Sequence, residues 1–228
     1  MYEQYQILHR QYFDGDLSVE ALLFHVGNLL SVEVNQTIEF PDEPCMIISN
    51  HPKCDPRAGL QTRNLGSLKG HNYYQHNTLW FPTIREIVMQ HIIPRPFKTL
   101  ARPIGYDIGM QELGCLLLPP GHGVTHTTHY LKRRPHLSCL IYPEGGFNRL
   151  FSQSFRNGFY HIARNVGYAY IVWLIIDPIL GLYRRNRVTA MCVEPVPHLP
   201  ESTQSWVTHV QNRYIANTNQ LYQEFNLE

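Results

Sequence analysis

Short apolar runs and stretches with helical periodicity alternate along most of the chain. The apolar runs predict buried strands, at residues 46–49, 137–142, 168–176 and 187–194. Alternation of Val32 and Val34 with polar neighbours adds a half-buried strand over 31–40, and a short strand with turns is expected over 97–109. Apolar residues three or four apart predict helices, at residues 17–30 with Ser18 as N-cap, 78–93, 122–134, 159–165 with Gly167 as C′ glycine, and 203–225.

Alternation of strands and helices favours an α/β fold, in which a central, largely parallel sheet is flanked by helices. The chain has 228 residues, enough for one substantial core. We therefore expect an N-terminal extension over residues 1–16 and a single domain over residues 17–228. Apolar residues make up 43% of the sequence and charged residues 16%, which is a globular rather than a disordered composition.

Charge, cysteine usage and the length of the apolar runs narrow the function classes. The formal net charge of +1 gives no reason to expect a nucleic-acid partner. Five cysteines without a C-x-x-C pair suit reduced thiols in the cytoplasm better than a disulfide framework. The N-terminus lacks the pattern of a signal peptide, and the longest apolar run, 168–176, is shorter than the roughly 20 residues that span a bilayer. We expect a cytoplasmic protein without a transmembrane helix.

The strand over residues 46–49 leads into polar residues that suit acid–base chemistry. Asn50 and His51 follow the strand, Pro52 is expected to open a helix or a tight turn, and Asp55 stands four residues after the histidine. A carboxylate that accepts the proton of one imidazole nitrogen leaves the other nitrogen basic. His51 is therefore the candidate general base and Asp55 its orienting partner. The alternative is a capping histidine in a surface turn.

The strand over residues 137–142 ends in a similar way, at Tyr142-Pro143-Glu144-Gly145-Gly146. Ligands in open α/β sheets bind beyond the carboxyl ends of the strands, so Glu144 is a candidate for contact with a substrate. A purely structural carboxylate would fit the same pattern. Gly145 and Gly146 would let the main chain approach a ligand closely.

Three segments in this order resemble blocks of the glycerophospholipid acyltransferase superfamily, the group of the lysophosphatidic acid acyltransferases. They are Asn50-His51-x-x-x-Asp55, Tyr142-Pro143-Glu144-Gly145, and the run from Phe155-Arg156-Asn157-Gly158 through Ala163 to Gly167. The resemblance implies an O-acyltransferase that moves a fatty acyl group from acyl-CoA or acyl-carrier protein to a hydroxyl of a lysophospholipid-like or other lipid acceptor. It also implies peripheral association with a membrane surface and no cofactor or metal. Its implied site has His51 as base, Asp55 as orienter, and acceptor contacts at Asn50, Glu144, Gly145 and Gly146.

The chain departs from the family pattern at two points. Three residues rather than four separate His51 from Asp55, so the carboxylate reaches the imidazole differently or not at all. Gly146 and Phe147 stand where the family has Thr-Arg, whose arginine is expected to hold the glycerol phosphate. The candidate replacements, all cationic side chains suited to phosphate, are Arg149, Arg102 and Lys98. Alternatively, the acceptor carries no phosphate.

Other functions are compatible with these residues. The altered motifs suit a lipid-binding relative that does not catalyse. His122, His126 and His129 are spaced to share one face of a helix, which would suit a metal hydrolase, although a solvated polar face is the simpler account. Cys54 is close enough to His51 in sequence to suggest a cysteine nucleophile as a further alternative.

Overall fold

The computed structural model describes residues 2–34, 39–54, 84–101, 111, 113–143, 157–177, 179–180 and 185–196, and part of the segment 205–220. The helices are α1 (Tyr2–Asp14), α2 (Val19–Gly27), α6 (Gly123–Lys132) and α7 (Gly158–Val166), with a further helix over residues 84–92 and helical positions within 205–220. The strands are β1 (Ser31–Val34), β2 (Met46–Ser49), β3 (Lys53–Cys54), β4 (Phe97–Ala101), β5 (Leu116–Leu117), β6 (Ser138–Ile141), β7 (Tyr170–Ile176), β8 (Ile179–Leu180) and β9 (Arg185–Pro195).

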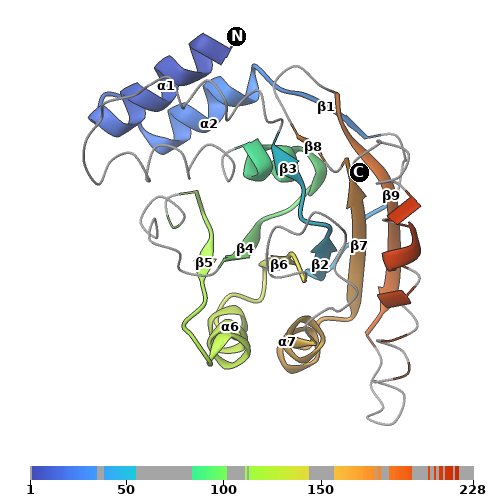
Figure 1. Cartoon of the computed structure of the whole chain (residues 1–228). Helices are drawn as coiled ribbons and strands as arrows, with labels where there is room; N and C mark the ends of the chain where they lie inside the picture. Colours follow the sequence, from blue (N-terminus) through green and yellow to red (C-terminus); the bar gives the residue numbers. More distant parts are fainter. Residues whose placement is uncertain are drawn as a thin grey trace.

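Seven of the described strands form one mixed sheet, in the order β1-β9-β7-β2-β6-β4-β5 (Figure 1). Strand β2 lies between β7 and β6 and runs parallel to both. Strand β4 is parallel to β6 and β5, and β1 is parallel to β9. Among the described strand pairs, only β7 and β9 are antiparallel. The predicted α/β class with a largely parallel sheet flanked by helices is confirmed.

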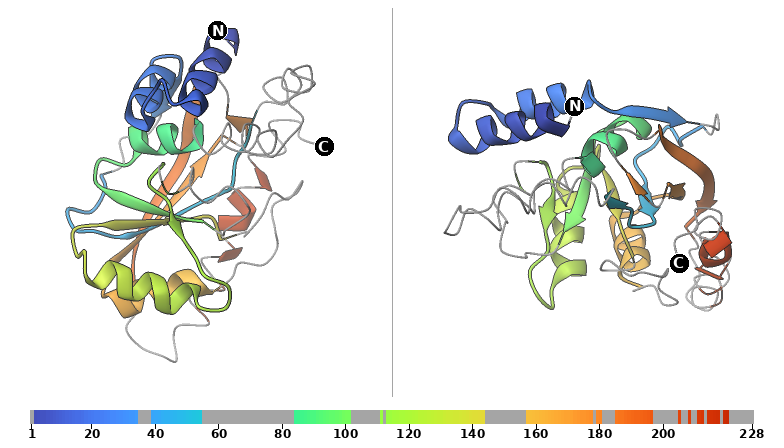
Figure 2. Two further views of the ribbon diagram at one scale, coloured as in Figure 1. Left: turned by 90° about the vertical axis from the view of Figure 1, so that its left-hand side faces the viewer. Right: turned by 45° about the horizontal axis from the view of Figure 1, so that its top comes forward.

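Helices cover both faces of the sheet. Helices α1 and α2 and the helix over 84–92 pack on one face, whereas α6 and α7 lie side by side on the other (Figures 1 and 2). Strand β2 joins the two cores, because successive side chains of a strand point to opposite faces. Ile47 packs on the face covered by α1, α2 and the helix over 84–92, whereas Met46 and Ile48 pack on the face covered by α6 and α7. All three are fully buried, which explains the uninterrupted apolar run.

Local sequence signals place several element ends as predicted. Strand β2 spans the predicted residues 46–49. The side chain of Ser18 caps α2 by accepting a hydrogen bond from the main-chain N–H of Ala21 at 3.2 Å. Gly167 ends α7 with φ at 89°, in the left-handed region that costs other residues about 1–2 kcal/mol. The helices predicted over 17–30, 122–134 and 159–165 are confirmed as α2, α6 and α7. Of the helix predicted over 78–93, residues 84–92 are helical, and residues 78–83 lie outside the described residues.

Two strands depart from the predicted pattern. Residues 53–54 do not begin a helix or tight turn after Pro52 but form β3, which is parallel to β8 with Lys53 opposite Ile179. Strand β9 contains the predicted strand 187–194 but is antiparallel to β7, unlike the other described strand pairs of the sheet. Both differences depend on partners far along the chain, which the pattern of a strand by itself does not specify.

The N-terminal residues form a helix that the sequence pattern did not predict. Helix α1 lies beside α2 at one end of the molecule (Figure 1), and its Tyr5 is fully buried in the core on that face of the sheet.

None of the described helices is long and apolar enough to cross a membrane.

Candidate active site

The carboxyl ends of β2 and β6 lie side by side, which brings two of the predicted segments together. Ile48 of β2 is opposite Ile141 of β6, so the residues that follow both strands are at the same level. The rings of His51 and Tyr142 consequently pack against each other, with their centroids 4.9 Å apart. This edge of a parallel sheet is where α/β proteins bind ligands.

Asn50 fixes the position at which the chain leaves β2. Its side-chain nitrogen Nδ2 donates a hydrogen bond to the main-chain oxygen of Ile176 at 3.0 Å. Its Oδ1 accepts one from the main-chain nitrogen of the same residue at 2.9 Å. Asn50 is fully buried, so both bonds are shielded from water. The amide thus replaces a missing main-chain pairing between the ends of β2 and β7, and it holds the following histidine in place.

The hydrogen bonds of His51 define its tautomer. Arg85 Nη1 lies 3.5 Å from Nε2 of the imidazole, and a guanidinium can only donate, so Nε2 is the acceptor. Nδ1 therefore carries the hydrogen and faces the main-chain oxygen of Pro52 at 3.2 Å. A main-chain carbonyl thus holds Nδ1–H, as the predicted carboxylate would, and leaves Nε2 with its lone pair.

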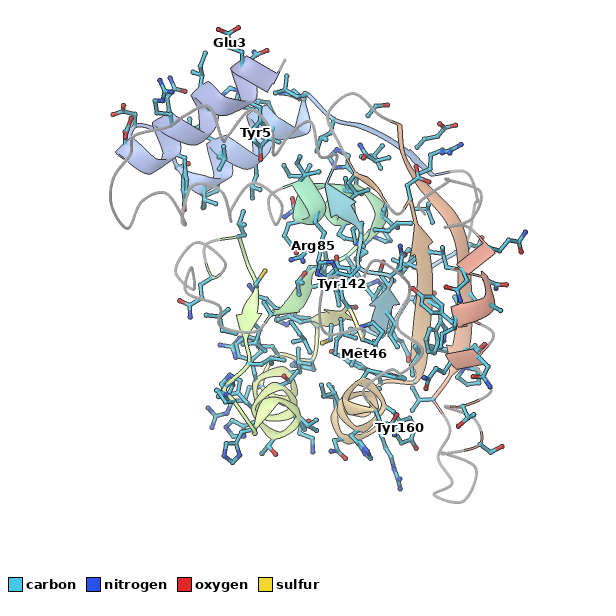
Figure 3. The ribbon with its side chains drawn as sticks, viewed as in Figure 1. Glu3, Tyr5, Met46, Arg85, Tyr142 and Tyr160 are labelled. Carbon is cyan, nitrogen blue, oxygen red and sulfur yellow. The ribbon has the colours of Figure 1, made fainter. Side chains whose placement is uncertain are left out.

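Arg85 belongs to a buried charged network that sequence reasoning missed. Its Nε and Nη2 donate to Glu86 Oε1 at 3.2 and 3.0 Å, and Thr99 Oγ1 donates to Glu86 Oε2 at 2.7 Å. The guanidinium carbon lies 4.7 Å from the ring centroid of Tyr142, and the two residues sit together near the centre of the molecule (Figure 3). A charged Arg-Glu pair inside an otherwise apolar helical stretch, Ile84-Arg85-Glu86-Ile87-Val88-Met89, was the signal that could have revealed it.

Burial and charge shift the acid–base properties of this cluster. Burial, followed by the Arg85 guanidinium, lowers the pKa of His51 to about 3, so the imidazole is neutral at physiological pH. Burial acts against the charge of Arg85, but Tyr142 and Glu86 outweigh it and raise the pKa of the guanidinium. Burial also raises the pKa of the Tyr142 hydroxyl well above its ordinary value. The cluster therefore holds a neutral imidazole next to a permanent cation.

The structure places some of the predicted site residues and not others. Asn50 and His51 lie together, whereas Lys98 lies on β4 opposite Cys139, three residues before Tyr142 along β6. The other predicted site residues fall outside the described residues; they are Asp55, Arg102, Glu144, Gly145, Gly146 and Arg149. The roles assigned to all of these residues stay predictions.

The three histidines of the alternative metal site lie at the surface. His122 precedes α6, His126 and His129 are part of it, and all three are exposed. Within the part of the chain that the structure describes, no three His, Cys, Asp or Glu side chains come together as metal ligands. The described residues therefore give the metal-hydrolase alternative no support.

Comparison with known proteins returned a structural likeness but no sequence match. No family model matches the chain, and no curated protein matches it in sequence. Among solved structures, the chain is similar to the 1-acyl-sn-glycerophosphate (LPA) acyltransferase PlsC from Thermotoga maritima. The alignment covers 87% of this chain and 80% of that chain, with 15% sequence identity and a TM-score of 0.44.

Proposed function

We propose that the protein is an O-acyltransferase that moves a fatty acyl group from acyl-CoA or acyl-carrier protein to a hydroxyl of a lipid acceptor, with His51 as general base. The observation that carries the proposal is the neutral imidazole at the adjoining ends of β2 and β6, with Nδ1–H held by a main-chain carbonyl and Nε2 as the nitrogen that accepts a hydrogen bond, here from Arg85. The order of the three acyltransferase-like segments in the sequence supports the same chemistry.

The proposed reaction is a direct transfer without an acyl-enzyme. Nε2 of His51 takes the proton of the acceptor hydroxyl as its oxygen attacks the thioester carbonyl carbon. The tetrahedral intermediate then collapses, the carbon–sulfur bond breaks, and the imidazolium returns the proton to the departing thiolate. The products are an ester and a free thiol, with no external oxidant, reductant or metal required. Asp55 is proposed to stabilise the imidazolium in the substrate complex.

The guanidinium of Arg85 limits the basicity of His51 in this mechanism. An imidazole with a pKa of about 3 is unprotonated at pH 7 but is a weak base. An anionic substrate group that pairs with Arg85 would draw the guanidinium from Nε2 and raise the pKa of His51. We therefore expect an acceptor or donor with a phosphate to react better than a neutral analogue.

The remaining site residues are proposed to bind the acceptor. In the sequence, Glu144, Gly145 and Gly146 come shortly after Tyr142, whose ring packs on His51. Arg149 and Arg102 are proposed phosphate contacts, Lys98, the third predicted contact, lines the cleft described below, and Asn50 acts by holding the strand end. A lipid acceptor further implies that the protein works at a membrane surface from the cytoplasm, as a peripheral protein.

The test is acceptor-dependent thiol release by the purified protein. Long-chain acyl-CoA and acyl-carrier protein are offered separately with lysophospholipids and with hydroxylated lipids that lack phosphate. His51→Ala is expected to lower the rate by about 10²–10⁴-fold, the usual contribution of a general base. The matched control is His126→Ala, a change at an exposed histidine of α6, which should retain wild-type activity.

Two results would reject acyl transfer by this site. One is thiol release that persists in His51→Ala at the wild-type rate. The other is wild-type protein that binds the lipids but releases no thiol with any acceptor. The second result would favour the non-catalytic lipid-binding alternative, for which the specific observation is that Arg85 already occupies Nε2 of His51.

A further inference from the structure

A cleft of about 480 Å³ opens next to the helix over 84–92, within the range of small-molecule sites. Its walls come from the end of this helix, the segment that leads into β4, and the turn before β5. The lining residues are Glu86, Gln90, Ile93, Pro94, Arg95, Pro96, Phe97, Lys98, Leu113 and Gly114.

The cleft has two cations whose charge the described residues do not neutralise. Lys98 is partly buried and has no hydrogen bond or ion pair among the described residues. Arg95 donates from Nη1 and Nη2 to the main-chain oxygens of Glu43 and Pro41, which are uncharged acceptors. Its Nε is buried and has no partner in the described part of the chain. Partly buried cations are normally paired, so this pair suits an anionic ligand.

Glu86, the one carboxylate among the described residues that line the cleft, is already neutralised. Both oxygens of Glu86 are engaged, one by Arg85 and the other by Thr99. Glu86 therefore leaves the positive potential of Lys98 and Arg95 in place.

Gly114 leaves room for the lysine ammonium. A Cβ at this position would lie 3.7 Å from Lys98 Nζ, so any longer side chain would compete with a ligand for the ammonium. Gly114 also has φ at 90°, which favours glycine for the turn itself. The ammonium thus lies next to bare main chain at the wall of the cleft.

The cleft is separate from the candidate base. Lys98 is level with Cys139, three residues before Tyr142, which corresponds to about 10 Å along the strands. His51 packs on Tyr142, at the far end of that distance. The register thus separates Lys98 from the candidate base, and Glu86, which lines the cleft and pairs with Arg85, links the two regions.

We propose that this cleft is a second binding site, which takes an amphipathic anion with a compact phosphate or carboxylate head. Lys98 and Arg95 bind the head, and the apolar part of the ligand packs on Pro94, Pro96 and Phe97, the apolar lining residues that keep exposed surface. The site lies beyond the proposed acyl-transfer centre and does not depend on it.

The test is isothermal titration calorimetry with three eight-carbon probes, octyl phosphate, octanoate and octyl glucoside, each below its critical micelle concentration. At least one of the two anions should bind, and the neutral glucoside should bind at least tenfold more weakly. Comparison of octyl phosphate with octanoate identifies the preferred head. Lys98→Met should weaken anion binding about tenfold, the size of one charge-assisted hydrogen bond. Lys132→Met removes the same charge from an exposed position on α6 and should change nothing.

A second pair of variants tests the charge of the cleft without touching a packed residue. Gln90→Glu adds a carboxylate at an exposed position of the cleft and should weaken anion binding, whereas Gln4→Glu on α1 should not. His51→Ala should bind the anions as wild type does, even if acyl transfer is absent. Equal binding of the glucoside and the anions, no binding of either anion, or unchanged binding in both Lys98→Met and Gln90→Glu would overturn the proposal.

Discussion

Asn50 offers the sharpest test of how the site is held in place. Replacement by Ala leaves the N–H and the C=O of Ile176 without their partners in a place that water does not reach. Each buried, unsatisfied main-chain group costs about 1–3 kcal/mol, so Asn50→Ala should lower the free energy of unfolding by about 2–6 kcal/mol. That is a large part of the roughly 5–15 kcal/mol that stabilises a typical domain.

Asn50→Asp separates the two hydrogen bonds. One carboxylate oxygen can still accept from Ile176 N, but the other faces the carbonyl oxygen that Nδ2 now binds at 3.0 Å. Only the protonated carboxyl can donate there, so the pKa of the introduced group is raised in the folded state above about 3.9. An acid with a raised folded pKa loses stability as the pH rises through that pKa. Asn50→Asp should therefore be less stable than Asn50→Ala at pH 7 and recover on acidification toward pH 4.

Urea unfolding followed by far-UV circular dichroism at pH 7 and pH 4.5 measures both effects. Asn165→Ala is the matched control, because Asn165 is exposed on α7, and it should stay within about 0.5 kcal/mol of wild type. A loss below about 1 kcal/mol for Asn50→Ala would show that the two hydrogen bonds do not hold the strand end. The same conclusion follows if Asn50→Asp shows no greater pH dependence than Asn50→Ala.

Two further predictions concern the neighbouring cluster. The NMR resonances of the His51 imidazole, assigned by comparison with His51→Gln, should keep their neutral-form positions down to about pH 4, because the pKa is lowered to about 3. Since the pKa of His51 is lower in the folded state than in the unfolded state, the stability that His51 contributes falls as the pH drops below about 6.5. A midpoint near 6 would contradict the burial argument. Thr99→Val should lower the free energy of unfolding by about 1–3 kcal/mol, because it removes the hydroxyl that donates to Glu86 Oε2. Thr125→Val, at an exposed position of α6, should lower it much less. Equal losses of the two variants in urea unfolding would contradict the role of the Thr99 hydroxyl.

Sequence patterns were most informative where the cause is local. The limits of β2, the Ser18 cap of α2 and the glycine after α7 were all predicted, because each depends on residues within a few positions. The apolar runs also predicted a buried sheet, and the alternation with helices predicted its largely parallel character. The N-terminal helix was missed because its polar and aromatic residues show no clear apolar stripe.

The candidate base was found from sequence, but its surroundings were not. His51 was recognised as a polar residue at a strand exit, which is a local pattern. Arg85 lies 34 residues further along, and its contact with Nε2 exists only because the helix over 84–92 packs on the same face as Tyr142. The amide of Asn50 likewise finds its partner 126 residues away, at the end of β7.

The sequence alone therefore determined the α/β class, the position of the central strand and the identity of the candidate base. Tertiary structure decided the antiparallel direction of β9, the pairing of β3 with β8, the tautomer of His51 and the cation beside it. The physical reason is the distance along the chain over which each interaction acts. Hydrophobic periodicity and helix caps depend on residues within one or two helical turns of each other. Hydrogen-bond partners and the electrostatic surroundings of a side chain depend on segments that only tertiary packing brings together.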